Sequence, residues 1–447
     1  MKTSRLNPGL PIGLLTTVLL TAGAAASTDK PPRLKDVFKH HFYVGVAINH
    51  SIATDQASPF GRSQDQVNKD VALTVEQFNQ ISPENDLKWS SIQPRPGPDG
   101  YNFGPADAYV DFGLKHHMLI VGHNLVWQGQ TPFWVFAAGT PQAPTDGAPA
   151  PANPPANPPA PANAPGQAPS GARVTSPPTN APRSAPGGGP FGRGGFNRGR
   201  FGGGFRFTGP LATRDELLKR MRDHIMTVVG RYKGKIKVWD VVNEPVADGG
   251  PAILKNTLWE RIIGPDYVAR AFEYAHKADP KAILRINDYG LENPAKRQRF
   301  ITLVKQLQAE HVPVMAVGSE THISVSYPTP EEEDQALTDL EQLRLPIHIT
   351  ELDVNGAQSG QGQAGAEITD NSATTKGGLV SDADQRLATQ YANLFKVFMK
   401  HKSVKVVTFW DLNDATSWRS AGKPLLFDGN DNPKPAFYAV VKVGMGK

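Results

Sequence analysis

The sequence predicts a (β/α)8 barrel, and three observations lead to that fold class. Eight short apolar stretches alternate with about eight longer stretches of helical periodicity along the 447 residues. Strict alternation indicates a parallel sheet, and eight strand–helix repeats close a barrel. Polar clusters follow nearly every apolar stretch, whereas a doubly wound open sheet, the structural alternative, gathers its polar residues at one crevice.

The expected strands are continuous apolar runs, which is typical of strands that are buried on both faces. In chain order they cover residues 42–48, 81–83, 119–125, 238–244, 282–286, 314–317, 346–351 and 404–409. The expected helices cover residues 70–79, 106–117, 213–232, 267–278, 295–310, 330–343, 382–400 and 435–443. Thr213 opens one of them, because Glu216 three residues later completes a capping box.

The first 26 residues are expected to be a secretory signal peptide. Lys2 and Arg5 precede an apolar run from Ile12 to Ala22, and small residues up to Ala26 form a cleavage site. The apolar run is shorter than the roughly 20 residues of a membrane span, which disfavours a membrane anchor. We therefore expect an extracellular or periplasmic protein that has no membrane association after cleavage.

The chain contains no cysteine. Disulfides, thiol nucleophiles and thiolate metal sites are therefore excluded.

Residues 139–209 are expected to be a disordered insertion after the third strand. Ala143 to Ala172 is rich in proline, alanine and asparagine, and Gly187 to Gly204 is rich in glycine, arginine and phenylalanine. Neither half can bury enough apolar surface to offset the entropy of ordering it. The expected organisation is a signal peptide at 1–26 and one catalytic barrel at 27–447, with this insertion inside the barrel.

The net charge of +5 comes from the insertion, which holds six arginines and one acidic residue, Asp146. The rest of the chain carries 41 basic and 41 acidic residues. This balance gives no basic face that would favour nucleic acid as a partner. The insertion itself is expected to be a passive spacer or, alternatively, an element that binds an acidic polymer.

Two glutamates at strand ends form the candidate catalytic pair. The stretch VWDVVNEP at 238–245 is apolar up to Asn243 and Glu244, and the stretch PIHITELD at 346–353 carries Glu351 in the same way. Strand ends of a barrel meet at its carboxyl face, where two carboxyls can approach to about 5 Å, a separation that suits double displacement at a sugar. The alternative for each glutamate is a structural ion pair at the rim.

Six short motifs occur in order along the chain. They are SPENDLKW (82–89), GHNLVW (122–127), WDVVNEP (239–245), INDY (286–289), ITELDV (349–354) and a terminal pattern of Phe409-Trp410 and Ser417-Trp418. Together they resemble glycoside hydrolase family 10, the endo-β-1,4-xylanases, over about residues 37–136 and 210–445.

The resemblance implies a role for each matching residue. Glu244 would be the acid/base, Glu351 the nucleophile, and Asn243 would hold the 2-hydroxyl of the sugar at the cleavage point. His322 would orient the nucleophile, with support from Asp353. The other matches are contacts to the sugars, namely His123 and Trp127 on the same sugar, Glu84, Asn85 and Lys88 on the next one, and Asn287, Tyr289, Trp410 and Trp418 lining the site.

Three features depart from the family pattern. Glu320 stands where the family has glutamine, and a third carboxylate would raise the pKa of a neighbouring carboxyl or stay protonated itself. Asp411 stands where the family has glycine, which we expect to narrow the space beside an aromatic wall. The insertion at 139–209 follows the third strand and is expected on the catalytic face.

The sequence therefore predicts a secreted, retaining endo-β-1,4-xylanase that acts on xylan or xylo-oligosaccharides as a monomer, without cofactor or metal. Two alternatives stay open. One is cleavage of another β-1,4-glycan, and the other is a polysaccharide-binding protein that has lost catalysis.

Overall fold

The computed structural model describes residues 32–59, 61–139, 209–356 and 380–447. Residues Arg33–Lys447 form one compact unit. The predicted signal peptide at 1–26 lies outside the described residues. So do the predicted insertion, apart from Gly139 and Gly209, and most of the polar loop between the seventh barrel strand and the next helix.

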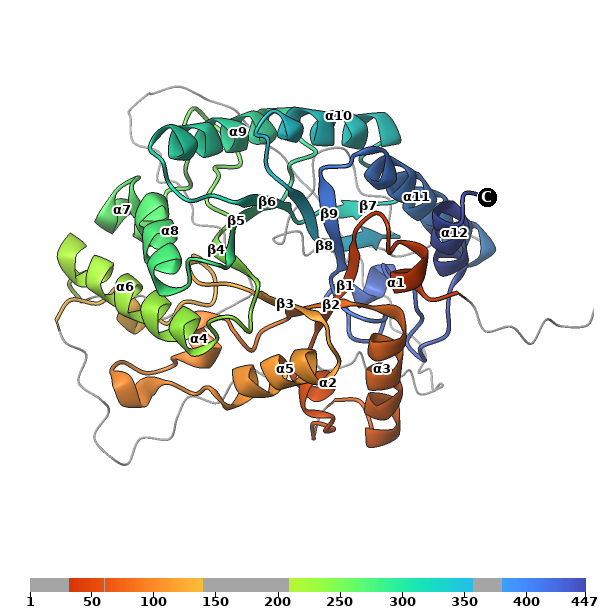
Figure 1. Ribbon diagram of the computed structural model, residues 1–447, viewed down its shortest axis with the longest axis horizontal. Coiled ribbons are helices and arrows are strands. Elements are labelled where there is room, and N and C mark those ends of the chain that lie inside the picture. The colour runs from red at the N-terminus through yellow and green to blue at the C-terminus, as the bar shows by residue number, and fades with distance from the viewer. Residues whose placement is uncertain (1–31, 60, 140–208, 357–379) are drawn as a thin grey trace, which may run out of the picture. The chain divides into compact units, whose positions relative to one another are not determined.

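Eight parallel strands form a closed barrel, which confirms the predicted fold class (Figure 1). Their order is β1-β2-β3-β4-β5-β6-β8-β9, and the pairing of β9 with β1 closes the ring. The strands are β1 (Tyr43–Ile48), β2 (Gln80–Pro83), β3 (Leu119–Gly122), β4 (Val238–Asn243), β5 (Ile283–Asp288), β6 (Ala316–Ser319), β8 (Ile347–Asn355) and β9 (Val404–Phe409). A ninth strand, β7 (His322–Ser324), pairs with β8 outside the ring, so that His322 lies opposite Asp353.

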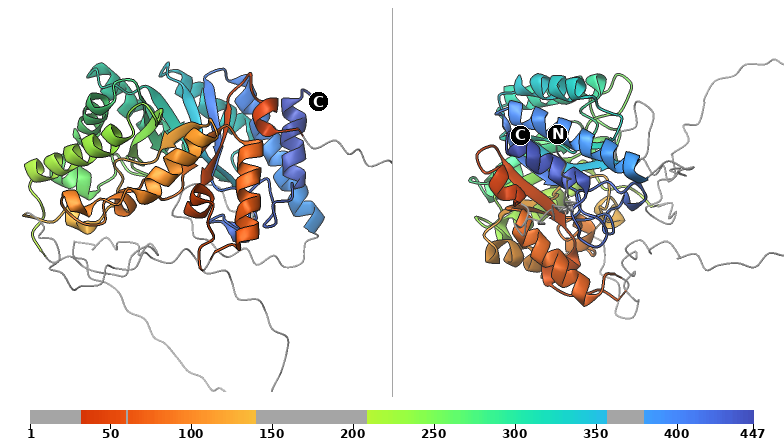
Figure 2. Two further views of the ribbon diagram at one scale, coloured as in Figure 1. Left: turned by 60° about the horizontal axis from the view of Figure 1, so that its bottom comes forward. Right: turned by 90° about the vertical axis from the view of Figure 1, so that its right-hand side faces the viewer.

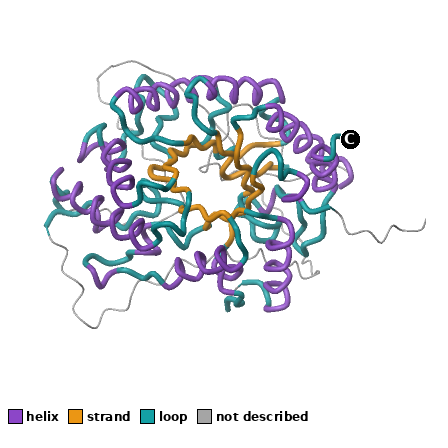
Figure 3. The backbone as a smooth tube through the Cα atoms, in the orientation of Figure 1, coloured by secondary structure: helices purple, strands orange, loops and turns teal. Residues whose placement is uncertain are grey.

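Helices surround this ring of strands (Figure 3). The long helices are α3 (Gln64–Gln77), α5 (Gly104–Lys115), α6 (Arg214–Arg231), α8 (Tyr267–Ala278), α9 (Pro294–Ala309), α10 (Pro330–Glu341), α11 (Val380–Lys400) and α12 (Pro435–Gly444). The short helices are α1 (Leu34–Val37), α2 (His50–Thr54), α4 (Trp89–Ile92) and α7 (Leu258–Ile263), with 3-10 turns η1 (Pro98–Gly100), η2 (Phe133–Val135) and η3 (Ser420–Gly422).

Every predicted strand and helix has a counterpart in the structure. The predicted helix 70–79 begins six residues earlier, at Gln64, because Ser63 and Gln66 form a capping box there. The predicted capping box of Thr213 and Glu216 is present at the start of α6. The four short helices and β7 were not predicted, because segments of three to six residues do not complete a recognisable hydrophobic period.

The barrel interior is closely packed. All residues of β4 are buried, as expected for a parallel strand covered on both faces. A Cβ atom at Gly122 of β3 would lie 2.1 Å from the ring of Trp239 on β4. Only glycine therefore fits at position 122 without moving that indole.

The two strands that carry the candidate glutamates are both irregular. The register between β4 and β5 shifts between Asp240 and Val242, and that between β8 and β9 shifts between Ile349 and Leu352. An extra residue in one strand bends it and re-aims the side chains that follow. Glu351 lies inside the second irregularity, within β8 rather than at its end.

The two ends of the predicted insertion are held together. Ala137 and Leu211 form an antiparallel bridge, and the backbone N–H of Ala138 donates to the carbonyl of Pro210 at 2.8 Å. Arg220 of α6 donates to the carbonyls of Val135 and Ala137 at 2.8 and 2.6 Å. The segment 140–208 therefore leaves and re-enters the described structure at one point, between η2 and α6, after β3 as predicted. Figure 2 shows the strands and the surrounding helices in two further views.

No helix within the described parts of the chain is long and apolar enough to cross a membrane.

Candidate active site

Asn287 of β5 links the strand ends that meet at the centre of the site. Its Nδ2 lies 2.8 Å from Oδ1 of Asn243, 3.0 Å from Oε1 of Glu351 and 3.2 Å from Oε1 of Glu320. Its backbone carbonyl accepts a hydrogen bond from the N–H of Glu244 at 2.8 Å. One fully buried asparagine therefore contacts residues in β4 and β8 and the residue that follows β6.

Both oxygens of Glu351 are held by fixed donors. While Oε1 accepts from Asn287, Oε2 lies 3.2 Å from Nε2 of His322. Nδ1 of His322 lies 2.9 Å from Oδ2 of Asp353. Burial lowers the pKa of His322, but Asp353 and Glu351 outweigh burial and raise that pKa to about 9. A protonated imidazole therefore faces Glu351 at neutral pH and donates from Nε2 to one of its oxygens.

Asp353 is itself well satisfied, although it is completely buried. It accepts hydrogen bonds from the indole Nε1 of Trp418 and from Nη1 of Arg419, each at 2.9 Å. Burial raises the pKa of Asp353, but the charges of Arg419 and His322 outweigh it and hold that pKa below the ordinary value. Asp353, whose charge Arg419 and His322 balance, therefore fixes the orientation of the His322 ring through Nδ1.

Glu244 follows β4 in a left-handed backbone conformation, with φ of 52°. Such a conformation costs a non-glycine residue on the order of 1–3 kcal/mol and is concentrated at functional sites. Its Oε2 accepts a hydrogen bond from Nε2 of Gln128 at 3.0 Å and lies 3.5 Å from Nζ of Lys255. Burial raises the pKa of Glu244 and the ammonium of Lys255 lowers it, with a net rise. Glu244 therefore keeps its proton to a higher pH than an exposed glutamate.

Tyr289 lies in a charged cluster with Asp248, Lys255 and Lys296, and Lys255 connects this cluster to Glu244. Its Oη donates to Oδ2 of Asp248 at 2.9 Å and accepts from Nζ of Lys255 at 3.0 Å. The ammonium groups of Lys255 and Lys296 lie 4.3 and 3.2 Å from the centre of the tyrosine ring. Burial lowers the pKa of Lys255, but Glu244 and nearby aspartates outweigh it, so that the pKa rises and the cation is retained.

His123 is oriented by a buried ion pair. Its Nδ1 lies 3.0 Å from Oδ2 of Asp240. Arg285 donates to both oxygens of Asp240, from Nε to Oδ1 at 2.6 Å and from Nη2 to Oδ2 at 2.8 Å. The same ring nitrogen lies 3.9 Å from Oε1 of Glu351. Burial and then Arg285 lower the pKa of His348 to about 3, so its neutral ring accepts from the guanidinium at 3.0 Å.

Glu84, Asn85 and Lys88 form a second polar group after β2. Nδ2 of Asn85 donates to Oε1 of Glu84 at 2.9 Å, and Nζ of Lys88 donates to Oδ1 of Asn85 at 3.0 Å. Nζ of Lys88 lies 5.3 Å from the ring centre of Trp127 and 5.9 Å from that of Trp410. Burial lowers the pKa of Lys88, whereas Glu84 and Glu351 oppose that change. Lys88 therefore joins this group to the site around Glu351.

Trp410 and Trp418 stand edge-on to the two histidines of the site. The ring centre of Trp410 lies 5.3 Å from that of His123, and the ring centre of Trp418 lies 5.1 Å from that of His322. Asp411 between them has φ of 83°, which is a conformation that favours glycine. Burial, followed by the charge of Glu84, raises the pKa of Asp411 well above its usual range.

All fifteen residues predicted for the site therefore lie in one connected arrangement, and the sequence missed several of their partners. Arg285 could have been found, because a charged residue inside the apolar run ILRIND signals a buried ion pair. Gln128 and Lys255 carry no such signal. They lie in loops, and only the fold brings them to Glu244.

Glu320, His322 and Glu351 are the only described group of three residues that could hold a metal ion, since one ligand atom from each lies within 4.8 Å of the others. The protonation of His322 opposes metal binding, because its Nε2 carries a hydrogen toward Glu351.

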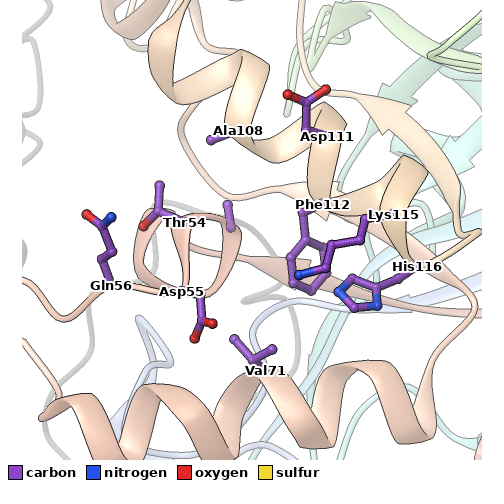
Figure 4. A pocket seen from close by; sticks show the side chains of 10 residues that line it. Thr54, Asp55, Gln56, Val71, Ala108, Asp111, Phe112, Lys115 and His116 are labelled. Carbon is purple, nitrogen blue, oxygen red and sulfur yellow. The ribbon is translucent and has the colours of Figure 1, made fainter.

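A separate cavity of about 490 Å³ lies between α2, α3 and α5, away from the site (Figure 4). Thr54, Asp55 and Gln56 line one part of it, and Lys115 and His116 line another. None of the predicted site residues lines this cavity, so we assign it no part in the chemistry.

The model of Glycosyl hydrolase family 10 matches residues 33–146 and 207–443 of the chain. Endo-1,4-beta-xylanase A of Caldicellulosiruptor sp. (strain Rt8B.4) is 33% identical over 412 residues, covering 92% of this chain and 47% of that protein. An endo-1,4-beta-xylanase of Geobacillus stearothermophilus is 31% identical over 420 residues, covering 92% and 98%. Exoglucanase XynX of Acetivibrio thermocellus is 32% identical over 418 residues, covering 92% and 29%. The chain thus spans nearly all of one of these relatives and less than half of the other two.

Solved structures of xylanases also match the chain. An intracellular xylanase of Thermoanaerobacterium saccharolyticum, a glutamate-to-alanine mutant in complex with xylotetraose, matches with a TM-score of 0.65 and 31% identity, covering 92% of this chain and 98% of that one. A GH10 endoxylanase from a sugarcane soil metagenome matches with a TM-score of 0.67 and 29% identity, covering 92% and 99%.

Proposed function

The chain belongs to glycosyl hydrolase family 10, and from this premise we propose that it is an endo-β-1,4-xylanase that hydrolyses xylan with retention of configuration. The observation that carries the proposal is the contrast between two buried glutamates. Glu351 is held by two fixed donors, one of them a protonated histidine, whereas burial raises the pKa of Glu244. One carboxyl is therefore suited to attack and the other to donate a proton.

In the first step, a carboxylate oxygen of Glu351 forms a bond to the anomeric carbon while the glycosidic carbon–oxygen bond breaks. Glu244 gives its proton to the leaving oxygen, which becomes the hydroxyl of the departing sugar. In the second step, the Glu244 carboxylate takes a proton from a water molecule, whose oxygen attacks the same carbon. The bond to Glu351 breaks, which restores both groups and gives net retention.

The neighbouring residues support this chemistry in defined ways. Asn243, whose Oδ1 already faces Asn287, would hold the 2-hydroxyl of the reacting sugar. His322 keeps a positive charge beside Glu351, and His123 lies on the other oxygen of that carboxyl. Lys88, with Glu84 and Asn85, would contact the adjacent sugar.

The nearest rival substrate is another β-1,4-glycan, which is favoured by the likeness to Exoglucanase XynX. A glucan carries a hydroxymethyl group where xylan has none. Asp411 carries a side chain where the family pattern has only glycine, and we expect this side chain to reduce the space for such a group. We therefore favour xylan.

We also propose that the protein is exported. This proposal rests on the leader sequence alone, because a similar solved structure is that of an intracellular xylanase and gives it no support. We further propose that the insertion is a passive spacer. The bridge between Ala137 and Leu211 joins its two ends, and the barrel is complete without residues 140–208. Deleting 140–208 and joining Gly139 to Gly209 should leave hydrolysis and polymer binding unchanged. A loss of either would show that the insertion binds substrate.

The direct experiment is product analysis on purified xylan, with the wild-type protein beside Glu351→Ala. We expect xylobiose and longer oligomers from the wild type and none from the variant. Cleavage of mixed-linkage glucan but not xylan would favour the rival substrate. Absence of products from both substrates, with binding retained, would favour a polysaccharide-binding protein.

A further inference from the structure

Glu320 follows β6 and is buried among the groups of the active site, with 1% of its surface exposed. Its Oε1 accepts a hydrogen bond from Nδ2 of Asn287 at 3.2 Å. Its Oε2 is buried and has no hydrogen-bond partner among the described residues. Nε2 of His322 lies 3.8 Å away, too far for a hydrogen bond, and is already directed at Glu351. A buried polar atom of this kind calls for a partner from outside the protein.

The charges around Glu320 disfavour its carboxylate form. Burial raises its pKa well above the usual range, and the charges of Glu351, Glu244 and Asp288 raise it further. Six titratable or charged groups face it, namely Glu351 of β8, Glu244 after β4, Asp288 of β5, His322 of β7, Lys296 of α9 and Lys255 before α7. The proton of the neutral acid lies on Oε2, because Oε1 accepts from Asn287.

We propose that Glu320 is a positioning residue that works as a neutral carboxylic acid, donating a hydrogen bond from Oε2 to a hydroxyl of the sugar bound at Glu351, and that its ionisation disables the site at alkaline pH. The proposal rests on the proposed function, since it needs a sugar at Glu351.

The consequence of ionisation follows from Asn287. Its side-chain nitrogen carries two hydrogens but faces three acceptors, on Asn243, Glu320 and Glu351. An ionised Glu320 loses its donor and becomes the stronger competitor for those two hydrogens. Glu351 or Asn243 then loses a partner that holds it in place for attack.

The test uses an aryl β-xylobioside with a leaving group that departs without protonation. Glu244 is then not needed as an acid, so its ionisation no longer appears in kcat/KM for the first step. Wild-type kcat/KM should still fall at alkaline pH, because Glu320 ionises. In Glu320→Gln, which keeps a neutral donor, that alkaline fall should move up by at least about one pH unit, and the fall that remains is the one caused by loss of the His322 proton. Activity at pH 6 should stay within about tenfold of wild type.

Glu333→Gln is the matched control. Glu333 of α10 is also buried, its Oε2 also has no partner within the described structure, and burial raises its pKa well above the usual range. It lies outside the active site, so its pH profile should superimpose on that of the wild type. Superimposed profiles for wild type and Glu320→Gln would overturn the proposal. So would an inactive Glu320→Gln protein with normal circular dichroism and thermal unfolding.

An infrared difference spectrum separates this inference from the proposed function. At pH 7 the wild type minus Glu320→Gln should show the carbonyl band of a protonated carboxyl, and this requires no substrate. If that band is present but xylobiosides are not cleaved, the proposed function fails while the neutral acid stands. If the band is absent, the inference fails whatever the activity.

Discussion

Glu351 and Glu244 are the same residue type in one site, but β8 and β4 surround them differently. Around Glu351 every partner is a buried side chain on or beside a strand, and the chain of contacts runs through His322 to Asp353 and Arg419. Around Glu244 the partners are Gln128 and Lys255, which come from loops. The first environment holds Glu351 between two fixed donors, whereas burial in the second raises the pKa of Glu244. The roles that we propose for the two glutamates therefore rest on environment and not on residue type.

Removing the Glu244 side chain should give the largest difference in kcat/KM between two substrates. In Glu244→Ala, kcat/KM on xylan should fall by roughly 10²–10⁴-fold, because a general acid contributes that much. On an aryl xylobioside whose leaving group needs no proton, the loss in kcat/KM should be much smaller.

Glu351→Ala is the matched comparison and should fail on both substrates. Steady-state kinetics on the two substrates measure the difference. Equal losses for the two variants on the activated substrate would contradict the assignment of separate roles.

The buried residues behind Glu351 should contribute more to the free energy of unfolding than the charged residues beside Glu244. Asp353→Asn removes the carboxylate that pairs with Arg419 and one of the two that pair with His322, and it should cost on the order of 3 kcal/mol of unfolding free energy. Asp248→Asn makes the same change at a side chain that is 55% exposed, where the cost should be at most about 1 kcal/mol. Urea unfolding of both variants checks this order. Equal costs would show that the two sides are equally rigid.

The pH dependence of stability should sharpen the same contrast. The pKa of His322 is about 9 in the folded state and 6.5 ordinarily, so its stabilising contribution is complete below pH 6.5 and is lost as the pH rises through 9. Wild-type unfolding free energy should therefore decline between these values. Asp353→Asn should flatten that decline, and an unchanged slope would contradict the ion pair.

The smallest effect is expected from Lys255. Its ammonium lowers the pKa of Glu244, so Lys255→Met should raise that pKa and move the alkaline limb of kcat/KM on xylan upward by about one pH unit. Lys255→Arg keeps the charge and should leave the limb in place. A limb that stays fixed or moves downward in Lys255→Met would show that the ammonium does not act on Glu244.

The surroundings of Glu351 and those of Glu244 also differ in how far the sequence could predict them. Glu351 and Asp353 lie in β8, a strand that the sequence predicts. His322 lies in β7, which the sequence does not predict, and only the family resemblance placed it beside Glu351. Gln128 and Lys255 lie in loops after β3 and β4, where no periodicity fixes which side chain meets Glu244. The barrel was predictable because eight apolar runs repeat, whereas short elements such as β7 are too brief for a pattern.

Two departures from the family pattern acquired a physical meaning only in three dimensions. Asp411 was expected to narrow the site, and the structure adds that it occupies a left-handed conformation that favours glycine. Glu320 was expected to perturb a neighbouring pKa, and its unpartnered oxygen and its place beside Asn287 come from the fold. Neither backbone angles nor missing partners can be read from residue order.

The most direct test of the central assignment is to trap the covalent intermediate. A 2-fluoro-xylobioside with a reactive leaving group should slow breakdown of the sugar–enzyme ester enough for mass spectrometry of peptides. We predict a single fluoro-xylobiosyl label on the peptide around 347–355, carried by Glu351. A label on Glu244 or Glu320, or turnover of the compound with inversion and no label, would contradict the account.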